Sequence, residues 1–506
     1  MFTKLTSGAI LGLNSIPIDV EVDIASQGLP SFTLVGLGDR AVEESKERVR
    51  SAIRNSGADF PSKRITVNLA PADLPKDSSS FDLAIALGLL KATGQIEANL
   101  EDTLVIGELS LDGTLRPVSG VLIHAILARD LSLKRIFLPI QNVTEAAMVS
   151  GIEVYGFSNL AQTVKFLMGL ELVTPEPQTE LEVDDVEYEY DFKDIKGQEQ
   201  AKRALEIAAS GGHNVILKGP PGAGKTLLAR CFPSILPPLT EEEVLEVTKI
   251  YSLSGFLSGG LSAITRRPFR SPHHTASYVG IIGGGNTIRP GEVTLAHRGV
   301  LFLDEFPEFG REVLESLRQP LEDRVISISR ASGTLKFPCQ FILLAAQNPC
   351  PCGFLGSLNR NCICMPGQIL RYKKRVSGPL LDRMDIHLEV PAVEVDKLTS
   401  NIEGEDSKSI RSRVKMARKI QQERFKGTEI FTNSEMSNSQ IKKFCSLDPE
   451  GVLLLKAAIT KMRLSARSYH RILKLSRTIA DLGGSEEIGL DHLSESLTYR
   501  FQDTYD

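Results

Sequence analysis

The chain has 506 residues, of which 42% are hydrophobic and 24% charged, so it is expected to be globular and to fold as about two to four domains rather than around one core. Its apolar runs fall short of the roughly 18 residues that a membrane span needs, and residues 1–4 do not open a signal peptide, which predicts a cytoplasmic protein without a membrane partner. The net charge is −5, but residues 171–191 alone hold nine acids and no Lys or Arg, so the remainder carries +4 and is compatible with a polyanionic partner.

Residues 1–170 are predicted to form an α+β domain. Strand-like stretches at 16–24 and 64–68 alternate with periodic stretches at 41–55 and 81–93 that predict helices, the first of which is stopped by a Ser-Gly pair. This part of the sequence carries no phosphate-binding pattern.

Two short segments of this domain carry a more specific signal. Residues 75–82 read PKDSSSFD and open a helix, and residues 107–113 read GELSLDG. Both resemble the proteolytic domain of Lon proteases, and on that resemblance Ser80 falls at the serine nucleophile. The position of the lysine base falls near Leu122, where His124 is the nearest titratable residue, and a serine without a positioned base is a weak nucleophile. We therefore expect a Lon-protease-like domain that is catalytically inactive and acts as a scaffold or assembly tier, with ATP-dependent proteolysis as the alternative.

The acidic stretch 171–191, which includes Pro175 and Pro177, is predicted to be a solvated linker, with an interaction tail as the alternative. Residues 194–198 then read DIKGQ. This segment resembles the adenine-proximal segment of AAA+ ATPases and implies that the nucleotide is ATP.

Residues 219–226 read GPPGAGKT and match the phosphate-loop pattern G-x-x-x-x-G-K-[ST]. Apolar runs at 215–217 and 227–229 predict the strand and the helix that must flank this turn. The glycines allow backbone N–H groups to approach phosphate oxygens, while Lys225 is expected to reach the β and γ phosphates and Thr226 to hold Mg²⁺. The predicted nucleotide site comprises Gly219, Pro220, Pro221, Gly222, Ala223, Gly224, Lys225 and Thr226.

Two later strands are predicted to complete this site. Residues 300–303 are apolar and lead into Asp304 and Glu305. We expect their strand to lie beside the phosphate-loop strand, with Asp304 on the Mg²⁺ shell and Glu305 polarising the attacking water. The apolar run 341–346 is followed by a glutamine and by Asn348, which resembles sensor 1 of AAA+ proteins and implies that Asn348 senses the γ-phosphate.

Two insertions distinguish this core. Residues 251–299 contain the basic segment RRPFRSPHH, and residues 325–337 alternate apolar and polar residues about a small-residue turn, which predicts a hairpin. Both resemble the helix-2 insert and the pre-sensor-1 hairpin of hexameric motors, which point into a central pore. The resulting candidate contacts to a DNA backbone are Arg267, Arg270, Arg330 and Lys336, the alternative being an exposed hairpin with solvated charges.

The basic segment ends in two histidines, His273 and His274. Adjacent side chains in a loop rarely bind one metal ion, so we assign both to phosphate contacts or to packing within the loop.

Four of the seven cysteines form two C-x-C pairs, and the odd total disfavours a disulfide framework. Four thiolates in two close pairs make a soft tetrahedral site whose usual occupant is zinc. The C-x-C spacing is less specific than C-x-x-C, and the alternative is reduced thiols in a loop. The candidate ligands are Cys350, Cys352, Cys362 and Cys364.

Residues 377–385 read SGPLLDRMD and resemble the arginine-finger segment of hexameric helicase and chelatase motors. On that resemblance Arg383 stabilises the charge that develops on the γ-phosphoryl group in a neighbouring subunit.

Residues 391–506 are predicted to form a helical lid. A segment that begins at residue 464 resembles the sensor 2 helix, with Arg467 as the first candidate for the sensor and Arg471, one turn later, as the second. An earlier helix of the lid is expected to bury an apolar stripe formed by Ile410, Val414, Ala417 and Ile420.

Together, these motifs resemble the Mg-chelatase-like ATPases of the YifB/ComM family along essentially the whole chain. The resemblance implies an α/β protein with a Lon-protease-like domain, an acidic linker, an AAA+ core and a helical lid at residues 1–170, 171–191, 192–390 and 391–506. It further implies a homo-hexamer that uses ATP and Mg²⁺, binds single-stranded and branched DNA, and works with recombination proteins to drive branch migration during natural transformation. A Mg-chelatase-type motor that remodels a protein client is the alternative.

Overall fold

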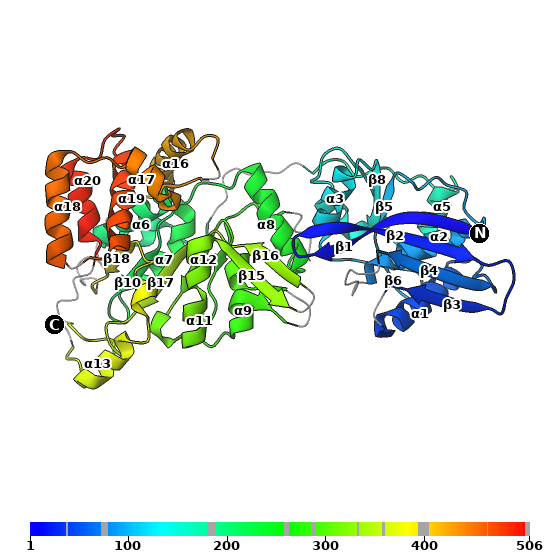
Figure 1. The fold of residues 1–506 in the computed structure, drawn as a ribbon, viewed down its shortest axis with the longest axis horizontal. Coiled ribbons are helices and arrows are strands. Elements are labelled where there is room, and N and C mark those ends of the chain that lie inside the picture. Colours follow the sequence, from blue (N-terminus) through cyan, green and yellow to red (C-terminus); the bar gives the residue numbers. More distant parts are fainter. Residues whose placement is uncertain are drawn as a thin grey trace. The chain divides into compact units, whose positions relative to one another are not determined.

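The computed structural model folds into two compact units (Figure 1), which are Met1–Glu182 with Glu241–Thr265 and Val183–Thr240 with Arg266–Asp506. The predicted ATPase core, 192–390, differs from this division because residues 241–265 pack with the first unit. None of the helices in the described residues is both long and apolar enough to cross a membrane. The structure describes residues 1–36, 39–71, 79–179, 188–257, 263–285, 289–330, 333–356, 360–392, 404–428, 430–462 and 464–500.

A seven-stranded sheet with the order β3-β4-β2-β1-β5-β8-β9 forms the centre of the first unit. Its β1-β2 and β2-β4 pairs are antiparallel, and the other pairs are parallel. The predicted strands at 16–24 and 64–68 are confirmed as β2 and β4, whereas the other five strands of this sheet were not predicted. The strands are β1 (Phe2–Leu11), β2 (Asn14–Ile24), β3 (Ser31–Val35), β4 (Arg64–Ala70), β5 (Thr103–Val105), β8 (Arg135–Pro139) and β9 (Glu153–Phe157), and β6 (Glu108–Leu109) pairs separately with β7 (Leu115–Arg116).

The helices of the first unit are α1 (Asp39–Asn55), α2 (Asp82–Ala92), α3 (Val121–Asp130), α4 (Val143–Ala146), α5 (Leu160–Leu167) and α8 (Glu241–Leu253). Helix α2 is buried on nearly all sides, as its continuous apolar sequence predicts. Its first residue, Asp82, accepts hydrogen bonds from Ser45 Oγ at 2.7 Å and Arg48 Nε at 2.6 Å, which ties α2 to α1. Burial raises the pKa of Asp82, although Arg48 and Ser45 oppose this shift.

The structure offers no open nucleophile at the position that resembles Lon proteases. Ser80 is buried with 4% of its surface exposed, and Lys76 lies outside the described residues. His124 is also buried, and its Nδ1 lies 2.8 Å from Ser15 Oγ. Burial lowers the pKa of His124 to about 4, so the ring is held neutral as a packing residue.

The second unit contains a five-stranded sheet in which all neighbouring strands are parallel, with the order β11-β14-β17-β10-β18. Strand β17 lies between β14 and β10, so the prediction that the strand before Asp304 lies beside the phosphate-loop strand is wrong. Sequence patterns mark strands but do not give their order in a sheet. The strands are β10 (Val215–Lys218), β11 (Phe269–Arg270), β14 (Val300–Leu303), β17 (Ile342–Gln347) and β18 (Ile386–Glu389).

Both faces of this sheet are buried. Val215 and Leu217 of β10 face a core that also contains residues from α6 (Glu199–Gly211), α16 (Ser407–Arg424) and α19 (Ala466–Leu482). Ile216 faces a second core that includes residues from α9 (Tyr278–Ile282) and α11 (Arg311–Ser316). Because both sets of alternating side chains are covered, the strands read as continuous apolar runs instead of alternating polar and apolar residues.

Helices cover both faces of this sheet, and a hairpin lies between β14 and β17 along the chain (Figure 1). The predicted hairpin is confirmed, since β15 (Val325–Arg330) pairs antiparallel with β16 (Gly333–Pro338). The other elements are α6 (Glu199–Gly211), α7 (Lys225–Cys231), α9 (Tyr278–Ile282), β12 (Gly283–Gly284), β13 (Arg289–Pro290), α10 (Glu292–Leu295), α11 (Arg311–Ser316), α12 (Arg318–Asp323), α13 (Pro366–Lys373), α14 (Gly378–Leu381), α16 (Ser407–Arg424), α17 (Asn438–Phe444), α18 (Pro449–Met462), α19 (Ala466–Leu482) and α20 (Leu490–Thr498).

The stripe predicted for the first lid helix, α16, holds for all but its last member. Ile410, Val414 and Ala417 are buried, but Ile420 is 37% exposed. The buried face continues instead at Gln421, which is fully buried. Its Nε2 donates to Ser210 O at 3.0 Å, so the burial of this polar side chain is compensated by a hydrogen bond to the end of α6.

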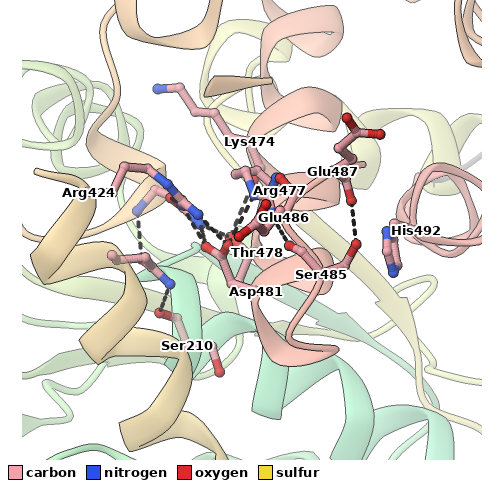
Figure 2. A network of polar contacts seen from close by, with 12 residues as sticks. Ser210, Arg424, Lys474, Arg477, Thr478, Asp481, Ser485, Glu486, Glu487 and His492 are labelled. Carbon is pink, nitrogen blue, oxygen red and sulfur yellow. Dashed lines mark hydrogen bonds and ion pairs between the residues drawn. The ribbon is translucent and has the colours of Figure 1, made fainter. Parts of the chain in front are cut away.

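A buried carboxylate joins the lid helices, as Figure 2 shows. Asp481 of α19 is fully buried and accepts hydrogen bonds from Arg424 Nη1 at 2.8 Å, Arg477 Nε at 3.0 Å and Asn433 Nδ2 at 2.7 Å. Lys474, on the same helix, points away from this group in Figure 2 and donates to a backbone carbonyl. Two guanidinium groups therefore depend on one carboxylate for their countercharge.

We predict that Asp481→Ala destabilises the second unit by roughly 3–5 kcal/mol, because it leaves two largely buried guanidinium groups without a countercharge. The measurement is the urea-unfolding transition of the full chain, followed by circular dichroism. Glu487→Ala is the matched control, since this exposed acid is expected to change the free energy of unfolding by no more than about 0.5 kcal/mol. Equal transitions for the two variants would contradict the assignment of the network as a structural element.

Candidate nucleotide-binding site

The phosphate loop connects β10 to α7, and its backbone requires glycine at several positions. Gly222 and Gly224 have φ angles of 76° and 83°, in the left-handed region that favours glycine. At Gly219 a Cβ atom would lie 2.1 Å from Val390 O, so the close approach of the chain after β18 excludes any side chain there.

Lys225 is the first residue of α7 and is 8% exposed. Its Nζ donates to Gly219 O at 2.7 Å, Pro220 O at 2.9 Å and Asn348 Oδ1 at 3.2 Å. Burial lowers the pKa of Lys225, although the charge of Asp304 opposes this shift. The predicted sensor residue, which directly follows β17, is thus in contact with the phosphate-loop lysine.

Thr226 and Asp304 provide the oxygen atoms that Mg²⁺ prefers. Thr226 Oγ1 donates to Asp304 Oδ2 at 2.9 Å, although β10 and β14 are separated by β17. The backbone N–H of Glu305 donates to Asp304 Oδ1 at 2.9 Å, which fixes the orientation of the carboxylate. A hydroxyl and a carboxylate at this position fit a magnesium ion bound through the protein and nucleotide phosphates together.

The segment that resembles the adenine-proximal region also reaches the phosphate loop. Gln198 Nε2 donates to Ala223 O at 2.8 Å and to Pro391 O at 3.2 Å. The start of α6, the phosphate loop and the chain after β18 therefore meet at one side chain.

Glu305 has a contact that sequence reasoning missed. Its side chain is 54% exposed, and its Oε2 lies 3.1 Å from His274 Nδ1. The sequence favours phosphate contacts or loop packing for His274. Its position just after β11, the strand next to β14, is what brings the imidazole to this carboxylate, and only the strand order reveals it.

The predicted arginine finger, Arg383, and the predicted sensor 2 arginine, Arg467, lie at the same carboxylate, that of Glu322. Arg383 is 5% exposed, donates to Pro379 O at 2.7 Å and forms an ion pair with Glu322 of α12. Arg467 lies 3.6 Å from the same carboxylate. Arg471 donates to Arg383 O at 2.9 Å, so the three arginines lie close together. The catalytic roles of these arginines stay predictions.

Two of the four candidate DNA contacts are engaged within the chain. Arg267 donates to Pro237 O and Pro238 O at 2.5 and 3.1 Å, and Arg270 forms a bidentate pair with Glu292 at 2.6 and 2.7 Å. These contacts favour structural roles for both residues, because their donors are already used.

The other two candidates lie on the hairpin. Lys336 is exposed on β16, opposite Ser327 of β15. The side chain of Arg330 lies outside the described part of the structure.

The four clustered cysteines converge after β17. The Sγ atoms of Cys350 and Cys352 are 3.4 Å apart, and those of Cys350 and Cys362 are 3.7 Å apart. All four Sγ atoms, including that of Cys364, lie within 4.8 Å of one another. Zinc bound tetrahedrally at about 2.3 Å would hold its sulfur ligands about 3.8 Å apart, so the donor set and its geometry fit zinc.

This cysteine cluster lies against the phosphate loop. Gly353, in the turn after Cys352, has a φ of 84°, and a Cβ atom added there would lie 2.5 Å from Pro221 Cδ. The turn that carries the first cysteine pair therefore packs closely on the loop that holds Lys225.

A parallel sheet in this strand order, with a phosphate loop after β10, paired acids after β14 and a polar sensor after β17, defines a P-loop ATPase of the AAA+ class. Family models for "Subunit ChlI of Mg-chelatase", "Magnesium chelatase, subunit ChlI" and "Magnesium chelatase, subunit ChlI C-terminal" match residues 20–142, 191–398 and 404–500. The chain is 44% identical to competence protein ComM of Haemophilus influenzae over 98% of this chain and 96% of that protein. It is 43% identical to protein YifB of Escherichia coli over 97% of this chain and 96% of that protein. The chain therefore belongs to the YifB/ComM family of Mg-chelatase-like AAA+ ATPases.

A more limited similarity covers part of the chain. Lon protease 2 of Bacillus subtilis is 35% identical over 158 residues, which are 28% of this chain and 26% of that protein. This match supports the Lon-like fold predicted for the N-terminal domain, while the buried Ser80 argues against protease activity.

We predict that Asn348→Ala lowers the rate of ATP hydrolysis by about 10- to 100-fold, because a hydrogen bond to a charged group is worth about 1.5–3 kcal/mol. Gln347→Ala is the matched control on the neighbouring residue and is expected to retain most activity, since the backbone carbonyl of Gln347 makes its contact with Gly219 N. Steady-state phosphate release is the measurement. A similar loss in both variants would show that the end of β17, rather than the Asn348 side chain, is what matters.

Proposed function

We propose that the protein is a hexameric ATP-driven DNA motor that promotes branch migration during recombination of incoming DNA. The observation that carries this proposal is the 44% identity, over 98% of the chain, to a relative named as a competence protein. The family implies ATP hydrolysis, and the arrangement of Lys225, Thr226, Asp304 and Asn348 supports the chemistry.

In the proposed mechanism each residue has a defined task during hydrolysis. Lys225 binds phosphate oxygens, Thr226 and Asp304 would hold Mg²⁺, and Asn348 orients the lysine through its side-chain oxygen. Glu305 accepts a proton from the attacking water. The magnesium ion, when bound, supplies positive charge to the phosphate oxygens.

The neighbouring subunit of a hexamer would contribute Arg383 to the developing charge on the γ-phosphoryl group. This role requires Arg383 to leave its pair with Glu322, because a guanidinium engaged with a carboxylate cannot also bind phosphate with the same donors. Arg467 shares that carboxylate, so release of one arginine is expected to alter the other.

The hairpin supports the DNA part of the proposal. Strand β16 carries an exposed lysine, Lys336, and a lysine can bind phosphate without reading sequence. Movement of such a hairpin during the hydrolysis cycle would draw a DNA strand by successive phosphate contacts. Single-stranded and branched DNA are the expected ligands.

The first test compares ATP hydrolysis without DNA and with single-stranded, duplex and four-way-junction DNA. We expect strong stimulation by DNA in the wild-type chain and a loss of stimulation in Lys336→Ala, because one phosphate contact per subunit is removed. Lys456→Ala, which changes an exposed lysine on α18, is the matched control and should behave as wild type. Hydrolysis that is indifferent to all DNA would instead favour a motor that remodels a protein client.

We also propose that the four clustered cysteines bind a structural zinc ion. The four Sγ atoms lie within 4.8 Å of one another, which is the spacing that four sulfur ligands of one tetrahedral zinc ion require. The ion would fix the turn that packs on Pro221 and would therefore stabilise the phosphate loop from outside.

The purified protein should contain about one zinc ion per chain by mass spectrometry of the metal content, because four thiolates saturate a structural zinc site. Cys352→Ser is expected to lose the metal, whereas Cys445→Ala, which changes a buried cysteine away from the cluster, should retain it. Wild-type protein purified without zinc, or zinc retained in Cys352→Ser, would contradict the assignment.

A further inference from the structure

The segment that carries Arg383 lies at the edge of the five-stranded sheet opposite to the phosphate loop. Arg383 comes just before β18, whose first residue, Ile386, pairs with Val215 at the start of β10. The phosphate loop follows the other end of β10, and the four residues of this strand span about 13 Å. The backbone at Arg383 is therefore held away from the phosphate loop of its own chain, which agrees with a role at the nucleotide of a neighbouring subunit.

Hydrogen bonds to Asn214 anchor this segment to the sheet. The backbone N–H groups of Asp385 and Ile386 donate to Asn214 O at 2.9 and 3.0 Å. Asn214 Nδ2 donates to Arg383 O at 3.2 Å, and Asn214 Oδ1 accepts from Leu343 N at 2.9 Å. These bonds fix the backbone that leads into β18, but they leave the preceding residues without a second support.

Arg471 of the lid helix α19 supplies that second support. Its Nη1 donates to Arg383 O at 2.9 Å and forms an ion pair with Asp385 Oδ1. The other oxygen of Asp385 accepts from Asn214 N at 3.1 Å and lies 3.4 Å from Nδ1 of the fully buried His213. Burial alone would raise the pKa of Asp385, but the charge of Arg471 and the contact with His213 outweigh it and lower this pKa. The carboxylate is therefore ionised and depends on Arg471 for its countercharge.

The same helix carries the predicted sensor 2 residue. Arg467 lies one turn before Arg471 on α19, so the two side chains share a face of the helix. Arg467 contacts Glu322 at 3.6 Å, and Glu322 also pairs with the guanidinium of Arg383. The pair between Arg471 and Asp385 thus sets where α19 stands relative to the predicted finger.

We propose that Arg471 is a positioning residue for Arg383 and not a sensor of the nucleotide. Through Asp385 and the carbonyl of Arg383, it holds the finger segment so that the Arg383 guanidinium is presented to the γ-phosphoryl group bound by a neighbouring subunit. To contact a nucleotide itself, Arg471 would have to leave a buried carboxylate without its countercharge. This proposal rests on the proposed hexamer and on the proposed role of Arg383.

The first test measures kcat and KM for ATP in the full chain. Arg471→Gln is expected to lower kcat by about tenfold with little change in KM, because the phosphate loop is intact and only the finger is misplaced. Arg471→Lys should recover part of the loss, since its ammonium group keeps a countercharge near Asp385. Tyr469→Ala, which changes an exposed residue of the same helix, is the matched control and should retain the wild-type kcat.

A mixing experiment separates a misplaced finger from a general structural defect. Glu305→Gln subunits retain Arg383 but lack the proposed base, whereas Arg471→Gln subunits retain Glu305. A mixed ring contains sites that combine Glu305 from one subunit with a correctly held Arg383 from the next. The mixture should therefore hydrolyse ATP several-fold faster than the sum of the two separate variants. If Arg471→Gln does not fold, Arg471→Lys takes its place and should show the same recovery.

Arg383→Ala distinguishes this proposal from the one on which it rests. If Arg383→Ala retains wild-type hydrolysis, the finger assignment is wrong, whatever Arg471 does. If Arg383→Ala is inactive and Arg471→Gln has the wild-type kcat, only the positioning role is overturned. A rise in KM at unchanged kcat, or a mixture without recovery, also overturns it. In the Arg383→Ala background, Arg471→Gln should cause no further loss of kcat, because both changes remove the same contribution.

Discussion

The alignment of parallel strands at one edge of the five-stranded sheet is the constraint on which the site depends. Strands β14, β17 and β10 are neighbours in that order, and all three are buried on both faces. Their carboxyl ends therefore deliver Asp304, Asn348 and the phosphate loop to one region. The hydrogen bond from Lys225 to Asn348 connects the residues that follow the neighbouring strands β10 and β17. The hydrogen bond from Thr226 to Asp304 connects the residues that follow β10 and β14, which are not neighbours. Burial of apolar strands thus fixes the positions of polar atoms.

Much of this arrangement could be predicted from the sequence, because its causes are local. The phosphate loop needs glycine where φ is positive, and buried strands need continuous apolar runs, so the strands before Lys225, Asp304 and Asn348 were identified correctly. The strand predicted to lie beside the phosphate-loop strand was the wrong one, because hydrophobic patterns do not encode which strands are neighbours. The contact between His274 and Glu305 was missed for the same reason, since it depends on β11 lying next to β14.

Other differences also come from tertiary packing. The buried face of α16 continues from Ala417 to Gln421 instead of Ile420, because Gln421 finds partners at the end of α6 and near Asn433. Residues 241–265 lie in sequence within the predicted ATPase core but pack with the first unit. Sequence motifs place such a segment in the same domain as its neighbours along the chain. In the folded protein, the segment belongs to the unit against which its apolar side chains pack.

We propose that ATP hydrolysis at this site drives movement on branched DNA. The most direct measurement follows the conversion of a labelled four-way junction into two duplexes by the full chain, with ATP and with a non-hydrolysable ATP analogue. The account predicts conversion with ATP alone, at a rate that rises with the rate of hydrolysis. Equal conversion with the analogue, or hydrolysis without any conversion of the junction, would contradict it.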